Sequence, residues 1–185
     1  APGMSTRPLG PPEQQIDYDG VNVIGGIAIP VIAYARRDVE PGIETAVDIA
    51  NVHRITVAGF QPRSGFDLNT IIGLELLDVQ YDYVAGFAGG SDIMAAMLRG
   101  EAEVATTALN SYRVGIRENF IDPGHGVGLW YIPPIGDDGE PIELADVDEA
   151  PAFHQLYQEI RGEMPSGPAW DAIMYLNNVP TILVA

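Results

Sequence analysis

Two glycine-rich loops carry the residues best suited to chemistry. Residues 59–65 read GFQPRSG, residues 86–91 read GFAGGS, and each loop lies between a predicted strand and a predicted helix. The first N–H groups of a helix have no acceptor within the helix, and the helix dipole favours negative charge there. Each loop is therefore a potential anion site, to which Ser64 and Ser91 would add hydroxyl groups. For either loop taken alone, an ordinary strand–loop–helix connection without a ligand is the alternative.

Covalent catalysis and metal binding find little support in the residue pattern. No G-x-S-x-G elbow surrounds Ser64 or Ser91, no G-x-G-x-x-G motif occurs, and the absence of lysine excludes a phosphate-binding P-loop. The acidic run 137–140 lacks the alternating ligands of a calcium loop. The histidines are far apart and follow no metal-ligand spacing, so we expect surface or structural roles for His53, His125 and His154.

We therefore predict that the protein is not an enzyme and has no catalytic residue, no metal site and no cofactor. An α/β enzyme domain that acts on a carboxylated or phosphorylated substrate is the alternative. It would require a catalytic base within hydrogen-bond reach of Ser64 or Ser91.

Strands and helices alternate through the middle of the chain. Strands are predicted at 55–58, 81–84 and 102–109, with helices after residue 65 and over 91–99. The first helix has an apolar stripe formed by Leu68, Ile71, Ile72, Leu76 and Leu77. Preceded by a strand over 31–34 and a short helix, this order predicts a parallel sheet covered by helices through right-handed crossovers. Both glycine-rich loops then lie at the carboxyl edge of that sheet, where ligands of such folds bind.

The flanking segments are less regular. Residues 1–20 read as an irregular lead-in, β-branched runs follow on both sides of Pro30, and the pattern loosens after Arg113. Residues 136–150 are dense in acidic groups and are predicted to form a solvated loop. The remaining expected elements are a short helix over 42–50, a strand over 127–132, helices over 151–162 and 170–176, and a strand over 179–184.

The charge balance restricts the partners. The chain has 26 acidic and 9 basic residues, all nine of them arginine, for a net charge of −17. Such a surface disfavours nucleic acid and anionic membranes. It indicates either an acidic surface that keeps the protein soluble or a halophilic source, and we favour the second because salt screens the self-repulsion.

Four motifs resemble the solute receptors of tripartite tricarboxylate transporters. They are GFQPRS at 59–64 after ITVA, GFAGGS at 86–91, RGEAE at 99–103, and the segment PAFHQLYQEIRGEMPSGPAWDA at 151–172. The resemblance covers roughly residues 20–185. It implies a periplasmic, or otherwise extracytoplasmic, two-lobed periplasmic-binding-protein fold of type II. Such a receptor closes on a small carboxylate and delivers it to membrane transporter subunits.

The resemblance also implies a division of the chain in which lobe one is incomplete. The chain is then a fragment, or another chain completes lobe one, or a truncated receptor relative serves as a structural or assembly subunit. The implied parts are the lead-in 1–20, crossing strands 21–35, the ligand-binding lobe two over 36–123, and a crossing strand, acidic loop and partial lobe-one elements over 124–185.

Carboxylate-binding positions carry over from the family one residue at a time. Arg63 stands where the family has glycine, and it either forms a bidentate pair with a carboxylate or points to solvent. Phe60 replaces the usual threonine. The ligand-binding residues implied by the resemblance, with Arg63 included, are Arg63, Ser64, Gly65, Gly89, Gly90 and Ser91.

Overall fold

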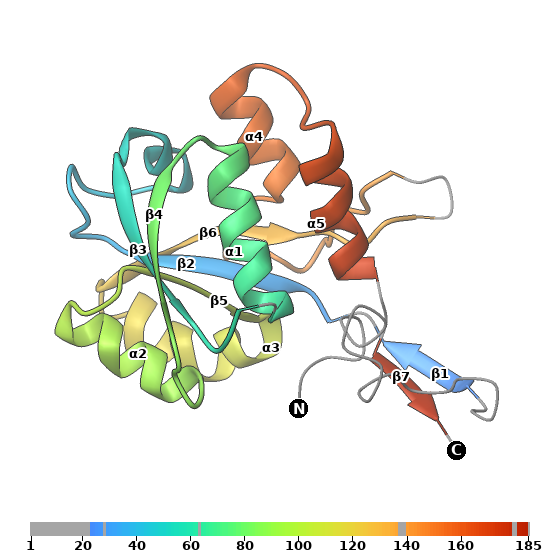
Figure 1. Ribbon diagram of the computed structural model, residues 1–185, viewed down its shortest axis with the longest axis horizontal. Helices are drawn as coiled ribbons and strands as arrows, with labels where there is room; N and C mark the ends of the chain where they lie inside the picture. Colours follow the sequence, from blue (N-terminus) through green and yellow to red (C-terminus); the bar gives the residue numbers. More distant parts are fainter. Residues whose placement is uncertain (1–22, 28, 63, 137–139, 179–180, 185) are drawn as a thin grey trace.

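A computed structural model describes residues 23–27, 29–62, 64–136, 140–178 and 181–184 of the chain (Figure 1). The predicted lead-in 1–20 and Arg63 lie outside these residues. The described strands are β1 (Val23–Ile27), β2 (Val31–Arg36), β3 (Arg54–Gly59), β4 (Gln80–Ala85), β5 (Val104–Ala108), β6 (Gly126–Ile132) and β7 (Thr181–Val184). The helices are η3 (Ala46–Asn51), α1 (Gly65–Leu76), α2 (Gly90–Arg99), α3 (Leu109–Ser111), η4 (Tyr112–Ile121), α4 (Phe153–Arg161) and α5 (Pro168–Asn178).

The central sheet has five strands in the order β4-β3-β5-β2-β6. Strand β3 is parallel to both β4 and β5, whereas β2 is antiparallel to both β5 and β6. Strands β1 and β7 pair with each other in a separate two-stranded sheet (Figure 1). The predicted parallel unit is therefore present for β3, β4 and β5. The first predicted strand departs from it, because β2 is antiparallel to β5, and β6 beyond it again runs in the direction of β5. The sheet is therefore mixed rather than all parallel.

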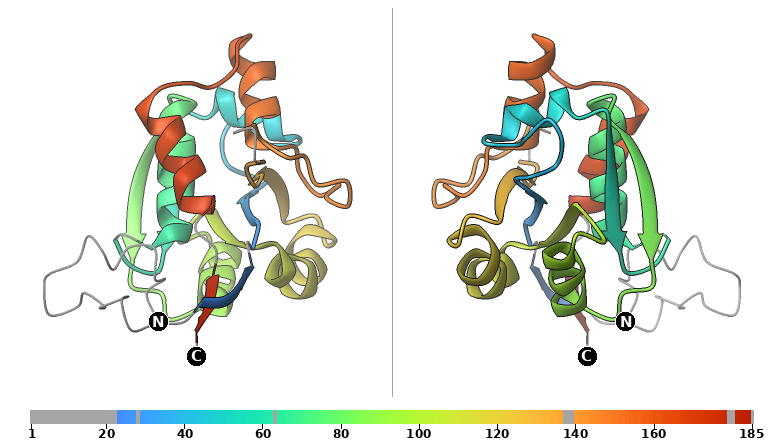
Figure 2. Two further views of the ribbon diagram at one scale, coloured as in Figure 1. Left: turned by 90° about the vertical axis from the view of Figure 1, so that its right-hand side faces the viewer. Right: turned by 90° about the vertical axis from the view of Figure 1, so that its left-hand side faces the viewer.

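Helices cover both faces of the central sheet, as Figure 2 shows in side view. Alternate residues of β2 separate the two layers, because Ala33 belongs to one hydrophobic cluster and Tyr34 to the other. Helices α1, α4, α5 and η3 contribute to the first cluster, around Trp130, and α2, α3 and η4 contribute to the second. The predicted three-layer α/β architecture is confirmed.

Helix α1 differs from its prediction. Its buried residues include Asp67, Asn69 and Thr70, whereas Leu68 and Ile71 of the apolar stripe are only half-buried. The stripe was expected to face the core, and Ile72, Leu76 and Leu77 do pack in the first hydrophobic cluster. In the first turns, polar residues take the buried positions because they find hydrogen-bond partners on the loop before α1 and on β4, β5 and α5, described below.

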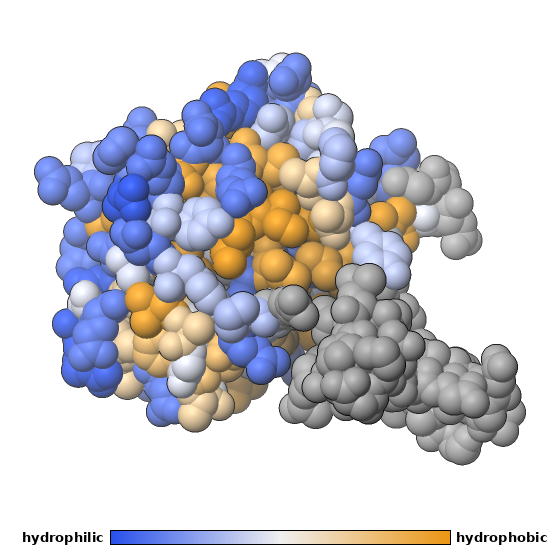
Figure 3. All heavy atoms as spheres, viewed as in Figure 1, coloured by the Kyte–Doolittle hydropathy of each residue, from blue (hydrophilic) through white to orange (hydrophobic). Residues whose placement is uncertain are grey.

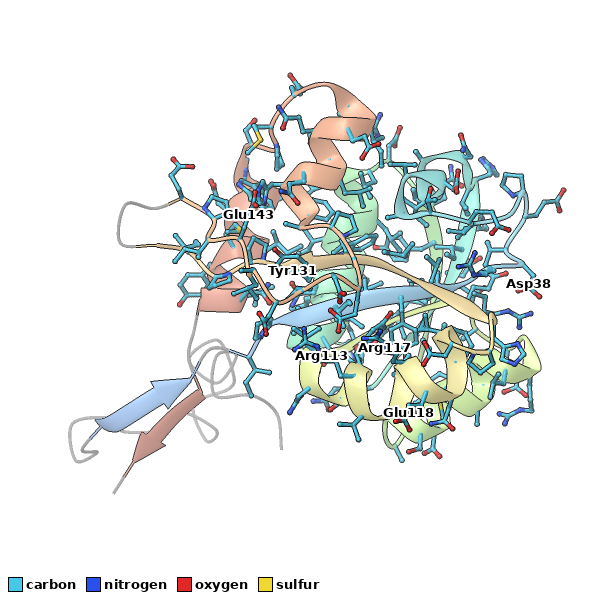
Figure 4. The ribbon with its side chains drawn as sticks, turned by 180° about the vertical axis from the view of Figure 1, so that it is seen from behind. Asp38, Arg113, Arg117, Glu118, Tyr131 and Glu143 are labelled. Atoms are coloured by element: carbon cyan, nitrogen blue, oxygen red, sulfur yellow. The ribbon has the colours of Figure 1, made fainter. Side chains whose placement is uncertain are left out.

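The segment after β5 forms the ten-residue π-helix η4, where the sequence pattern is loose. Its Arg113 fastens the described end of the acidic segment, because its Nε donates to Glu149 Oε1 at 2.6 Å. Figure 4 shows Arg113 and Arg117 on this helix. Arg113 holds the pKa of the Glu149 carboxyl below its usual range. The expectation of a fully solvated loop is wrong at Glu149, whose side chain is only 5% exposed.

The predicted helix over 42–50 shortens to the six-residue 3-10 helix η3. Gly42 has a φ of 118°, outside the helical region. Asp48 then accepts hydrogen bonds from the N–H groups of Glu44 and Thr45, at 3.0 and 2.8 Å. These bonds begin the helix at Ala46, because they cap the chain just before it.

One histidine is buried against the first layer. His154 in the first turn of α4 is 7% exposed, and its Nδ1 has no hydrogen-bond partner among the described residues. Its Nε2 lies 3.9 Å from Glu143 Oε1, and Glu143 is marked in Figure 4. Burial lowers the pKa of His154 below its ordinary 6.5, and Glu143 partly opposes that effect.

We expect acid to destabilise the fold partly through His154. The unfolded chain takes up this proton first as the pH falls through 6.5, so the histidine's contribution to stability falls with the pH. Thermal unfolding should therefore show a smaller loss of Tm between about pH 7 and pH 5 for His154→Leu than for the parent. Identical pH profiles would contradict this role of His154. Because carboxylates titrate in both proteins, the difference between the two profiles is the informative quantity.

Candidate functional site

Three strands of the central sheet end at one edge, each followed by a helix start. The parallel strands β4, β3 and β5 lie side by side, so their carboxyl ends share an edge. Strand order reverses at β3, because the crossover through α1 leads to β4 and the next, through α2, returns past β3 to β5. In open α/β sheets such a reversal marks the crevice in which ligands bind.

The two glycine-rich loops are joined at this edge. Gly86 N–H donates to Phe60 O at 3.1 Å, and Phe87 N–H donates to Gly59 O at 3.4 Å. The two bonds continue the β3–β4 pairing past the end of the strands. The loops therefore lie against each other, as expected for loops that follow neighbouring parallel strands.

A buried carboxylate fixes the loop in front of α1. Asp67 is 3% exposed, and its Oδ2 accepts from Gln61 N–H at 3.0 Å and from Tyr83 O–H at 2.8 Å. Partial burial and the hydrogen bond to Asp67 raise the pKa of Tyr83 well above its ordinary value. Gly59 makes this arrangement possible, because a Cβ there would lie 2.8 Å from Asp67 Cγ and in severe contact with the Tyr83 ring.

Further buried polar groups hold the first turn of α1. Asn69 Nδ2 donates to Gly65 O at 2.7 Å, and Asn69 Oδ1 accepts a short hydrogen bond from Asn177 Nδ2 of α5. The hydroxyls of Thr70 and Thr106 lie 2.5 Å apart and connect α1 to β5. These bonds satisfy polar groups that would be costly to bury alone, and they set the position of the helix start.

The predicted residues occupy both helix starts. Ser64 is the N-cap of α1 and Gly65 its first residue, while Gly89 is the N-cap of α2 and Gly90 its first residue. Neither N-cap residue makes a side-chain capping bond, so the Ser64 hydroxyl is not used by its own helix. Ser91 is exposed in the first turn of α2.

The two helices lie on opposite faces of the sheet. Helix α1 packs in the first cluster through Leu74, and α2 packs in the second through Ile93 and Met97. Both helix starts still open at the carboxyl edge, because both helices follow parallel strands. The structure thus brings the two loops together and places their helices on either side of them.

Sequence reasoning missed the third loop at this edge. Asn110 and Ser111 lie one residue after β5, are exposed, and belong to the short α3 that leads into η4. Because β5 adjoins β3 on the side where strand order reverses, they lie beside the crevice that the topology favours. Two polar residues directly after an apolar strand were the available signal.

The opposite edge of the sheet holds a hollow of about 160 Å³. It is lined by Arg36, Arg37, Asp38, Met97, Leu98, Phe120, Gly124 and His125, and Figure 4 marks Asp38 there. Its guanidinium groups are already engaged, Arg36 by Asp38 and by Met97 O, and Arg37 by Glu44 and by Gly126 O. The hollow therefore has fewer free hydrogen-bond donors for an anion than the carboxyl edge has.

The described part of the chain offers neither a metal cluster nor a membrane-spanning helix. No group of three or more metal-binding side chains occurs within it. None of its helices combines the length and the apolar character needed to cross a membrane. Among the same residues, neither Ser64 nor Ser91 makes a side-chain hydrogen bond to a histidine, aspartate or glutamate.

Comparison with known proteins rests on structure. No protein-family model matches the chain, and no curated protein matches it in sequence. The periplasmic binding protein BugD is similar in structure, with a TM-score of 0.59 and 15% identity over 93% of this chain and 57% of BugD. MatC from Rhodopseudomonas palustris, whose structure contains malate, has a TM-score of 0.57 at 16% identity over 94% of this chain and 58% of MatC.

A TctC solute-binding protein from Polaromonas is a third similar structure. Its TM-score is 0.50 at 12% identity, over 92% of this chain and 64% of the TctC protein. The chain thus spans less than two thirds of the length of each of these proteins. BugD and the TctC protein are binding proteins by description, and the resemblance read from the sequence motifs points to the same class. The chain has the α/β fold of periplasmic solute-binding proteins.

Proposed function

We propose that the chain forms the ligand-binding part of an extracytoplasmic receptor that captures a small carboxylate for a tripartite tricarboxylate-type transporter. One observation carries the proposal: the loops before α1 and α2 are hydrogen-bonded to each other at the carboxyl edge, through Gly86 and Phe60. Two helix N-termini thereby open beside one place, and each favours negative charge. The malate bound to the structurally similar MatC is a ligand of this chemistry.

The residues proposed to bind act through backbone and hydroxyl groups. The N–H groups of Gly65 and Gly90 would donate hydrogen bonds to the carboxylate oxygens, and the hydroxyls of Ser64 and Ser91 would donate beside them. Gly89 permits close approach of the backbone, and Arg63 is proposed as a bidentate partner of a carboxylate. Asp67 opposes an anion by its charge, and its hydrogen bonds from Gln61 and Tyr83 offset part of that effect.

The division into lobes follows from the same proposal. Residues 36–123 form lobe two, and the strands over 21–35 and after residue 124 belong to the crossing region and to parts of lobe one. In this account another chain, or a further part of a longer protein, completes lobe one and closes over the ligand by a hinge motion. The partners are the small carboxylate and the transporter's membrane subunits, and the chain itself performs no catalysis.

Calorimetric titration with a charged and a neutral form of one ligand tests the proposal. We expect saturable binding of malate to the chain and none of malamide, because only the carboxylate interacts with the helix starts as an anion. Affinity should fall as salt rises, since the attraction is electrostatic. Equal binding of the two compounds, or no saturable binding of malate, succinate or citrate, would contradict the proposed function.

A further inference from the structure

Helix α1 is apolar on its outer side. Asp67, Asn69, Thr70, Gly73 and Leu74 are its buried residues. Leu68, Ile71 and Ile72 are only half-buried, and Leu68 and Ile71 belong to neither hydrophobic cluster. An amphipathic helix normally buries its apolar residues, whereas the first turns of α1 bury polar ones. The outer side of α1 is therefore an apolar surface that the described chain covers only in part.

The apolar surface continues onto α5. The two helices pack side by side and are joined by the hydrogen bond between Asn69 and Asn177. Tyr175 of α5 is 67% exposed. Figure 3 shows apolar side chains gathered over α1 and its junction with α5. We call this surface, comprising Leu68, Ile71, Ile72, Ala172 and Tyr175, the α1–α5 face.

The charged residues within α1 and α5 are all acidic. Neither helix contains a lysine, arginine or histidine. Their exposed charged side chains are Glu75 and Asp171. Glu75 accepts a hydrogen bond from the Tyr81 hydroxyl at 2.9 Å, which leaves its negative charge in place. A complementary surface must then combine an apolar centre with positive charges around it.

We propose that the α1–α5 face is the docking surface for a protein partner that presents apolar side chains bordered by arginine or lysine. The charges disfavour a second copy of this chain, because it would bring Glu75 and Asp171 against each other while each copy has a net charge of −17. An anionic membrane is disfavoured for the same reason. The inference does not rest on the proposed ligand.

Two designed peptides of opposite charge provide the test. One is an amphipathic helix of leucine and lysine, about 18 residues long so that it can form a helix. The other replaces every lysine with glutamate. Fluorescence anisotropy should show that the lysine peptide binds the parent protein and the glutamate peptide does not.

Three variants locate the binding. The double variant Leu68→Gln/Ile71→Gln should bind the lysine peptide at least about tenfold more weakly than the parent, because it removes apolar contact without changing charge. Tyr175→Ser, at a largely exposed position, should also lower the affinity for the lysine peptide. It takes the place of the double variant if that variant unfolds. Val114→Gln is the matched control, since Val114 is 77% exposed on η4, across the sheet from α1. Its affinity should equal the parent's.

Two results would overturn the proposal. Equal peptide affinity in all four proteins would show that binding is non-specific attraction to an acidic surface. Sedimentation of the parent as a dimer that Tyr175→Ser dissociates would identify a second copy as the occupant instead.

Discussion

Gly59→Ala should lower the free energy of unfolding by about 1–3 kcal/mol, the range for overpacking a filled site. The added methyl group would lie 2.7 Å from Tyr83 Oη and 2.8 Å from Asp67 Cγ, and closer still to the Tyr83 ring. Tyr83 cannot withdraw without losing its hydrogen bond to Asp67, which also fixes Gln61. The substitution should therefore displace the loop before α1 and weaken carboxylate binding as well as stability.

Gly115→Ala is the matched control for Gly59→Ala. No atom lies within 4 Å of a Cβ built at Gly115, whose φ is not positive. This alanine should leave stability unchanged or raise it by about 0.4–1 kcal/mol by restricting the unfolded chain. Urea unfolding of the three proteins measures both changes. If Gly59→Ala were as stable as Gly115→Ala, the close contact of Gly59 with Tyr83 and Asp67 would be refuted.

Ser64→Ala combined with Ser91→Ala should weaken malate binding by about a hundredfold or more. Each hydroxyl would donate to a charged acceptor, and such bonds contribute roughly 1.5–3 kcal/mol each. Each single change should have an intermediate effect if both helix starts contribute. Calorimetric titration of the parent, the two single variants and the double variant measures these contributions, with Gly115→Ala as the control that should bind as the parent does.

The outcome for the serines separates two accounts of the site. If malate affinity falls only when Ser64 is replaced, the ligand lies at the β3–β5 crevice and the start of α2 does not bind it. Unchanged affinity in the double variant would remove both hydroxyls from the site.

The β3–α1–β4–α2–β5 unit could be predicted because alternating strands and helices with short loops have few compact arrangements. Which face of α1 meets the core could not be predicted from the sequence. Apolar spacing shows that Leu68 and Ile71 share a side, but it does not show which side meets the core. That depends on partners far along the chain, since Asn69 meets Asn177 and Thr70 meets Thr106.

The shared edge of the two glycine-rich loops followed from parallel pairing, and the hydrogen bond between Gly86 and Phe60 agrees with it. The separation of α1 and α2 onto opposite faces required the position of β5 on the far side of β3, which only the sheet order shows. The same order brings Asn110 and Ser111 beside the crevice. Ligand binding at Arg63, Ser64, Gly65, Gly89, Gly90 and Ser91 stays a prediction, as does the halophilic source.

The most direct test of the carboxylate site is an amide map by nuclear magnetic resonance. Malate is titrated into the isotopically labelled chain, with malamide and sodium chloride as separate controls. We predict that malate alone shifts the backbone amide signals of Gly65, Gly90 and Ser91, because their N–H groups lie at the two helix starts. Shifts centred on Arg36 and His125 at the opposite edge, or no shift at either helix start, would contradict the account.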